Sequence, residues 1–419
     1  MDMKFLREFF ARHSAKLGAQ DIFKYIGPGF LVTVGFIDPG NWASGLAAGA
    51  LHGYRLLWVV TASTLLLVLL QHNAAHLGIV TGLCLSESST KFFSRSMSSL
   101  ILLSAVLAAM ATVFAELLGS AIGLQMLFGL GLRAGAALTA AVVAILLATN
   151  SYRKVERWII AGVGLIGLAF VYELFLVPVD WAAAARGWVV PSVPLGSAAL
   201  VLAVCGSVVM PHNLFLHSEI IQSRQYNLQD DAAVDRRLRF EFADTLAAMG
   251  LGWAVNSAMV ILAAALFFSR GIAVTEIPQA QATLEPLLGR AAGVVFAAAL
   301  LCAGFVSTVT AAMAGGSIFA GVFGESYDVE DRHSRIGIAL TLLGGLAAIF
   351  FVRDAFKGLI ASQVALSLQL PLTVVPLALL TSSPKVMGRR AVSGAEKALL
   401  WAAVAATILI NALLLRDVL

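Results

Sequence analysis

The sequence predicts an all-α integral membrane protein with eleven transmembrane helices, of which the first and sixth are unwound near the middle of the bilayer. Three observations support this fold class. The 419 residues are 59% hydrophobic and only 12% charged, with a mean hydropathy of +0.89, whereas a soluble domain needs a polar surface. Apolar stretches long enough to cross a membrane recur along the whole chain. Two of those stretches contain an x-Pro-x-Asn tetrapeptide, a sequence that interrupts a helix.

The predicted spans follow one another with short polar connections, so no extramembrane domain is expected. A cytoplasmic N-terminal segment, residues 1–26, precedes them. The eleven predicted spans cover residues 27–52, 55–77, 97–122, 130–149, 157–177, 195–222, 241–268, 288–321, 334–351, 357–381 and 397–415.

The distribution of positive charge predicts the orientation in the membrane. If the N-terminus is cytoplasmic, most of the 28 Lys and Arg residues fall in cytoplasmic segments, as membrane proteins generally show. The C-terminus is then external, and the compact loops favour a bacterial inner membrane. The net charge of +4 follows from this topology, so no nucleic-acid partner is expected. The lipid bilayer is the expected environment, and no obligatory protein partner is indicated.

Neither cysteine spacing nor a hydrolytic motif points to an enzyme. Cys84, Cys205 and Cys302 fall in or beside spans without paired spacing, which argues against a disulfide framework or a zinc site. The His-Glu-x-x-His motif of zinc proteases is absent from the sequence. The sequence therefore predicts a protein that is not an enzyme.

The two tetrapeptides are Asp38-Pro39-Gly40-Asn41 and Met210-Pro211-His212-Asn213, about half a chain apart. A proline within a helix leaves the carbonyl four residues earlier without its helical donor. The carbonyls affected are those of Gly35 and Ser207. Paired broken helices in corresponding halves of a chain indicate a transporter whose binding site lies near the bilayer midplane.

The tetrapeptides also divide the chain into two corresponding halves. They lie in spans 1 and 6, so that residues 27–182 form a first repeat of spans 1–5 and residues 195–381 a second repeat of spans 6–10. Residues 397–415 add an eleventh span. This arrangement predicts an inverted five-plus-five repeat.

The side chains at the breaks suit a metal cation. Asp38 supplies an anionic oxygen, and an ionisable residue within a span is costly unless it has a function. Asn41 supplies a neutral oxygen, or alternatively caps the second half of its helix. Met210 supplies a soft thioether, which favours transition metals over magnesium and calcium, although a lone methionine usually serves packing. An amino-acid substrate is disfavoured, because Asp38 would repel its carboxylate.

Several segments resemble the Nramp family of divalent-metal transporters, in family order across nearly the whole chain. Gly27-Pro-Gly-Phe with Asp38-Pro-Gly-Asn41 resembles the family's first span, and Met210-Pro-His-Asn-Leu-Phe-Leu-His-Ser218 with Gln222-Ser-Arg224 resembles its sixth. The smaller matches are Leu77-Gly-Ile-Val-Thr-Gly82, Ala115-Glu116, Ser307-Thr308, Ala314-Gly315 and Ser362-Gln363-Val364 through Leu370-Pro371.

The resemblance implies a LeuT-like fold and proton-linked import of Mn²⁺, Fe²⁺ and similar ions such as Cd²⁺, Co²⁺ and Zn²⁺. No cofactor is implied, since the metal ion and the proton are transported substrates. Asp38, Asn41 and Met210 match family residues that bind the ion. Ser207 and Gly35 stand where the family usually has alanine, and their carbonyls remain available. Gln363 is retained, and is expected to reach the water shell of the metal.

A proton route needs titratable groups within the membrane. The candidates are Asp38, His212, His217 and Glu116, with Arg335 as the basic partner that the family resemblance implies in span 9. The family carries an Asp-x-x-Glu pair in span 3, but here Val113 replaces the aspartate. Phe305 similarly stands where the family usually has glutamine in span 8.

These departures leave two alternatives open. An uncoupled divalent-cation facilitator with the same fold would need no proton route, and Val113 favours it. A magnesium transporter of the same superfamily would need an all-oxygen site, and Met210 argues against it.

Overall fold

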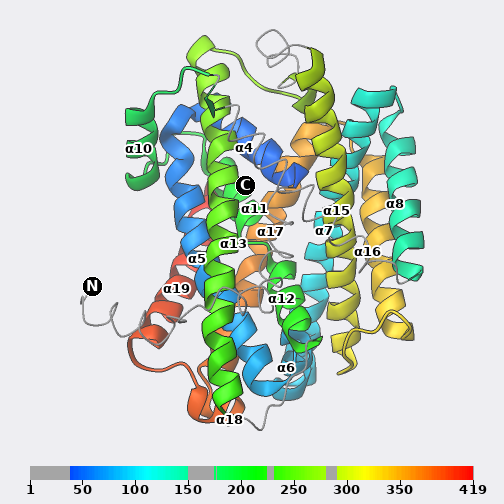
Figure 1. The fold of residues 1–419 in the computed structure, drawn as a ribbon, viewed down its shortest axis with the longest axis vertical. Coiled ribbons are helices and arrows are strands. Elements are labelled where there is room, and N and C mark those ends of the chain that lie inside the picture. Colours follow the sequence, from blue (N-terminus) through cyan, green and yellow to red (C-terminus); the bar gives the residue numbers. More distant parts are fainter. Residues whose placement is uncertain (1–37, 150–173, 176, 224–230, 280–289, 419) are drawn as a thin grey trace.

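The computed structural model describes residues 38–149, 174–175, 177–223, 231–279 and 290–418, which form an elongated bundle of helices (Figure 1). The described residues contain no strand. Most of predicted span 5, the first half of predicted span 1 and the predicted ligand Gly35 lie outside the described residues. The all-helical prediction is confirmed for the part of the chain that is described.

The first predicted break lies directly before helix α4 (Pro39–His52). Asp38 has an extended backbone, with φ −93° and ψ 161°, and its carboxylate accepts a hydrogen bond from the backbone N–H of Asn41 at 2.6 Å. Pro39 occupies the first helical turn, where its missing N–H costs nothing. The chain then continues through a 3₁₀ turn, η2 (Gly53–Leu56), into α5 (Leu57–Thr81).

The second predicted break separates α11 (Ala198–Val208) from α12 (Pro211–Ser223). Val209 leaves the helical region with φ −103° and ψ 76°, and α12 begins at Pro211. The break between α11 and α12 therefore falls at the second Pro-x-Asn tetrapeptide, as predicted, and α4 begins at the proline of the first.

Other helices complete the bundle and its ends. In chain order they are α6 (Leu85–Phe92), α7 (Arg95–Phe128), α8 (Leu132–Ala148), α10 (Trp181–Val189), α13 (Asp231–Leu266), η3 (Phe268–Arg270), α15 (Arg290–Val322), α16 (Arg332–Phe351), α17 (Ala355–Thr381), α18 (Pro384–Met387), η4 (Gly388–Arg390) and α19 (Gly394–Val418).

Eight segments of the described chain are long and apolar enough to cross a membrane, and α8 is a shorter apolar helix. One of the eight, Pro39–Thr81, contains both α4 and α5. This confirms a multi-pass membrane protein, while the count of eleven spans stays a prediction. One boundary and one additional helix differ from expectation. Helix α13 starts at Asp231, well before the predicted residue 241, and α10 was not predicted because it is too short to span.

The packing brings both breaks together in the interior. Helix α4 packs against α11, α13, α17 and α7, while α11 also packs along α17. Helix α10 lies at one end of the bundle, whereas α6 and α18 lie at the other (Figure 1). This separation agrees with the predicted alternation of loops between the two sides of the membrane.

Candidate functional site

The carboxylate of Asp38 is the centre of the candidate site. Asp38 is fully buried, and its two oxygens accept hydrogen bonds from Asn41, one from the backbone N–H at 2.6 Å and one from the side-chain amide at 3.1 Å. Pro39 is the first residue of α4, so the Asp38 carboxylate stands at the positive N-terminal end of that helix.

Asn41 joins the two broken helices. Its side-chain amide donates to the backbone carbonyl of Ser207 at 3.0 Å. That carbonyl lies four residues before Pro211, so the break in the sixth predicted span leaves it without a helical donor. Ser44, one turn after Asn41, adds a second link through its hydroxyl to the Ser207 hydroxyl at 3.2 Å. The sequence therefore predicted correctly that these two distant segments would meet.

Gln363 from α17 lies directly over the start of α4. A β-carbon added at Gly40 would overlap the Gln363 amide nitrogen and would lie 2.6 Å from its Cδ and 3.1 Å from Asp38 Oδ1. The Gln363 amide donates to the Ser362 hydroxyl at 3.2 Å, but its buried carbonyl oxygen has no hydrogen-bond partner among the described residues. An unpartnered buried oxygen beside a carboxylate is suited to a cation or its water shell.

Met210 lies at the break in the sixth predicted span, as expected, and is 1% exposed. Its sulfur accepts a hydrogen bond from the Asn213 side chain at 3.4 Å, and its side chain packs with Ala108 and Leu366. Asn213 thus holds the thioether in this conformation. Coordination of an ion by Met210 would exchange that weak contact for a metal–sulfur bond.

Solvent does not reach the candidate ligands in this conformation. Asp38, Asn41, Ser207, Met210 and Gln363 are all buried, none more than 3% exposed. An ion at this position would be enclosed, and both its entry and its release would need movement of the surrounding helices. Such occlusion is the expected property of a transport site that opens to one side at a time.

Glu116 supplies a second buried carboxyl group near Asp38. It lies on α7, is fully buried and interacts electrostatically with Asp38. Neither of its carboxyl oxygens has a hydrogen-bond partner in the part of the chain that the structure describes. One turn further on, Gly119 contacts Pro39, which fixes α7 against the start of α4. Among the described residues no Lys or Arg forms an ion pair with either acid, so a divalent cation or protons would balance their charge.

The two candidate histidines of α12 occupy different environments. His212 Nδ1 lies 3.2 Å from the Thr112 hydroxyl of α7. His217 Nε2 lies 3.8 Å from Glu241 Oε1 of α13, and no described residue forms a hydrogen bond with either ring nitrogen. Glu241 also lies 2.9 Å from His72 Nδ1 of α5. The histidines therefore continue from the break toward a buried carboxylate further along the bundle.

The structure does not bring Arg335 to Glu116. Arg335 is exposed near the start of α16, and its guanidinium donates to the Val329 carbonyl at 2.8 Å. Val113 is buried on α7 against α16, where a β-carbon at Gly345 would lie 2.7 Å from its Cγ1. Phe305 packs at the edge of the apolar core. Both departures from the family pattern therefore fill apolar positions.

Three contacts at the site were not predicted. They are made by Ser44, Thr112 and Asn213, whose side chains bond Ser207, His212 and Met210. Asn213 is part of the second tetrapeptide, so the sequence motif could have identified it as a residue of the site. Ser44 and Thr112 are single hydroxyl residues within apolar helices, and nothing in the sequence distinguishes them from similar residues elsewhere.

Comparison with known proteins identifies relatives along nearly the entire chain. The model of the family described as natural resistance-associated macrophage protein-like, or Nramp, matches residues 29–417. A protein of Caldanaerobacter subterraneus subsp. tengcongensis named divalent metal cation transporter MntH is 37% identical over 395 residues, covering 94% of this chain and 92% of the relative.

Solved structures agree with the fold. A crystal structure of the Eremococcus coleocola manganese transporter, in complex with an aromatic bis-isothiourea substituted compound, matches with a TM-score of 0.80 and 28% identity, covering 95% of this chain and 88% of that one. Mhp1, a nucleobase-cation-symport-1 family transporter, matches with a TM-score of 0.63 at 14% identity, covering 94% and 92% of the two chains. The second match concerns the fold alone, and the predicted LeuT-like fold is confirmed.

Proposed function

Because this chain belongs to the Nramp family, we propose that it imports divalent transition-metal ions, foremost Mn²⁺ and Fe²⁺, across the bacterial inner membrane together with protons. One observation carries the proposal. At the meeting point of the two broken helices, the Asn41 amide contacts both the Asp38 carboxylate and the freed Ser207 carbonyl, and all three residues are buried.

In the proposed site, Asp38, Asn41, the Ser207 carbonyl and Gln363 supply oxygen, and Met210 supplies sulfur. Gly35, outside the described residues, is proposed to add a further carbonyl. The Asn41 amide now donates hydrogen bonds, so its oxygen would face an ion only after a rotation about the terminal torsion. The thioether is the donor that favours Mn²⁺ and Fe²⁺ over Mg²⁺ and Ca²⁺. The two five-helix repeats, residues 27–182 and 195–381, would move relative to each other to expose the site to either side.

For the proton we propose a route that begins at Asp38 and Glu116 and continues along His212 and His217 of α12. Metal binding requires the ionised Asp38, so its proton is displaced when the ion arrives. Glu116 interacts electrostatically with Asp38, and His217 of α12 lies beside Glu241. Arg335 donates to a backbone carbonyl at the surface, so we leave it out of this route.

Uncoupled facilitation is the second candidate. Val113 packs as an apolar residue against α16 at the position where the family resemblance implies an aspartate. A chain with only Glu116 in this part of α7 has one acid fewer for moving protons across the membrane.

The test is Mn²⁺ uptake into proteoliposomes that contain both a metal-sensitive and a pH-sensitive dye. Uptake with internal acidification supports proton symport, whereas uptake at a constant internal pH supports the facilitator. Mg²⁺ uptake without Mn²⁺ uptake would contradict the assignment of Met210. The same vesicles with Asp38→Asn should show no uptake if the site is correctly placed.

A further inference from the structure

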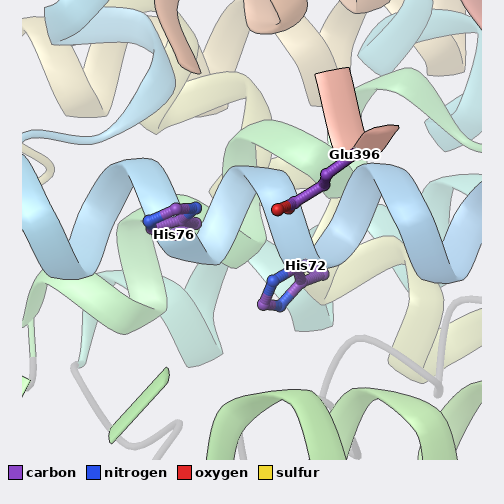
Figure 2. Close-up of side chains that lie close together, drawn as sticks. All are labelled: His72, His76 and Glu396. Carbon is purple, nitrogen blue, oxygen red and sulfur yellow. The ribbon is translucent and has the colours of Figure 1, made fainter. Parts of the chain in front are cut away.

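A second group of metal-binding side chains lies away from the two broken helices. His72 and His76 of α5 and Glu396 of α19 each place one potential ligand atom within 4.8 Å of the others. Figure 2 shows the Glu396 side chain extending from α19 toward α5, beside the two histidine rings. We propose that these three residues form a second site for a transition-metal ion, with zinc as its best match.

The spacing of the histidines is the first argument. Positions 72 and 76 are one helical turn apart, so both side chains project from the same face of α5. Their rings stack with centroids 5.9 Å apart and planes inclined by 28°. Zinc binds histidine nitrogen at about 2.0–2.1 Å. Two imidazoles in this arrangement can reach one ion at that distance by rotations of their side chains.

The support of His72 by other residues is the second argument. Glu241 Oε2 lies 2.9 Å from His72 Nδ1, and the Thr245 hydroxyl donates to Glu241 Oε1 at 2.7 Å. A carboxylate beside a histidine is the common outer partner of a metal-binding imidazole, since it fixes the orientation of the ring. The contact with Glu241 therefore holds the His72 ring in a fixed orientation.

The donor set and its surroundings define the class of ion. Two imidazoles and one carboxylate are ligands for Zn²⁺ and for Co²⁺, Ni²⁺ or Fe²⁺, whereas Mg²⁺ and Ca²⁺ prefer oxygen alone. His72 and His76 are buried, and Glu396 is partly exposed. An ion can therefore enter from the Glu396 side and bind to nitrogen ligands shielded from water.

The position within the bundle indicates where the ion would come from. Helix α19 begins shortly after α18, and α18 contacts α5 at the end of the bundle opposite α10 (Figure 1). The sequence places this end in the cytoplasm. A bound ion would tie α19 to α5 on the side to which the proposed transport delivers its substrate.

The other cluster of potential ligands carries less weight. Glu325, Asp331 and His333 also lie close together, but the Asp331 carboxylate already accepts the backbone N–H groups of His333 and Ser334 as the cap of α16. His333 is held between Glu325 and the stacked ring of Phe323. These three potential ligands already have structural partners on the same short segment, which accounts for their closeness without a metal ion.

The experiment measures Zn²⁺ binding to the full-length protein carrying Asp38→Asn, purified with a histidine-free tag and treated with a chelator. Isothermal titration calorimetry should show one Zn²⁺ per chain at the proposed second site. His76→Gln and Glu396→Gln, each added to Asp38→Asn, should weaken this binding by more than about tenfold. His52→Gln, at a histidine outside the cluster, is the matched control.

Unchanged Zn²⁺ affinity in both ligand variants would overturn the proposal, as would equal loss in His52→Gln. Circular dichroism of each variant before titration separates loss of a ligand from loss of the fold. Co²⁺ gives an independent readout, because imidazole coordination changes its visible absorption. The Asp38→Asn background makes this test independent of the proposed transport site, whose failure would appear in the uptake measurement instead.

Discussion

Asn41 and Ser207 are 166 positions apart in the chain, yet the Asn41 side-chain amide donates to the Ser207 backbone carbonyl at 3.0 Å. The contact exists because each residue lies at a helix break, one beside Pro39 and the other four positions before Pro211. It links the two discontinuous helices at the buried Asp38 carboxylate. The predictions below test what that junction and its neighbours do.

Replacing Asp38 by asparagine should abolish Mn²⁺ uptake and weaken Mn²⁺ binding by more than about tenfold. Asparagine caps a helix as well as aspartate does, so α4 should keep its N-terminus while the site loses its anionic ligand. Calorimetric Mn²⁺ titration and vesicle uptake are the measurements. Wild-type uptake by a correctly folded Asp38→Asn protein would show that the ion binds elsewhere.

Replacing Met210 by alanine should reduce discrimination against Ca²⁺ and Mg²⁺, because the remaining donors are all oxygen. The measurement is the ratio of Mn²⁺ to Ca²⁺ uptake under competition. Met249→Ala is the matched control, since Met249 is equally buried at 1% exposure but lies on α13 in the apolar core. If both variants keep the wild-type ratio, Met210 is a packing residue only.

The helix breaks were predictable because they depend on local chemistry. A proline within an apolar stretch removes a donor and fixes φ wherever the rest of the chain lies, so Asp38 and Met210 could be placed from sequence. The meeting of α4 with α11 followed from the recurrence of the same tetrapeptide in both halves. The family resemblance then supplied the fold that joins them.

Contacts between side chains of different helices were harder to predict. The position of Gln363 over Gly40 depends on how α17 packs on α4, which a linear pattern does not encode. Arg335 was expected beside Glu116, but an arginine near the start of α16 can keep its charge in solvent and bond the Val329 carbonyl. Burying that charge next to Glu116 would require desolvating both groups.

Gly40 provides a test of the contact with Gln363. A β-carbon at Gly40 would overlap the Gln363 side-chain amide, so Gly40→Ala should displace that side chain and weaken Mn²⁺ binding. Gly45→Ala on the same helix is the control, since its β-carbon would lie 3.4 Å from the nearest neighbouring atom, Met259 Cβ.

Mn²⁺ affinity is measured for Gly40→Ala, Gln363→Ala and the double variant. If Gly40→Ala acts through Gln363, the two effects should not add. Additive losses would show that Gly40 affects the ion by another path, such as the Asp38 oxygen that lies 3.1 Å from the same β-carbon position.

Replacing Glu116 by glutamine should separate metal movement from proton movement. Glu116 is fully buried, and neither oxygen bonds another described residue, so glutamine removes its proton chemistry while keeping its size. We expect Mn²⁺ to enter vesicles with less acidification per ion, and the pH dependence of uptake to flatten. Dual-dye vesicles measure both quantities in one experiment.

Glu330→Gln, at an exposed acid before α16, controls for a general effect of lost charge. An unchanged proton-to-metal ratio in Glu116→Gln would remove Glu116 from the route and leave Asp38 with the histidines of α12 as the remaining carriers.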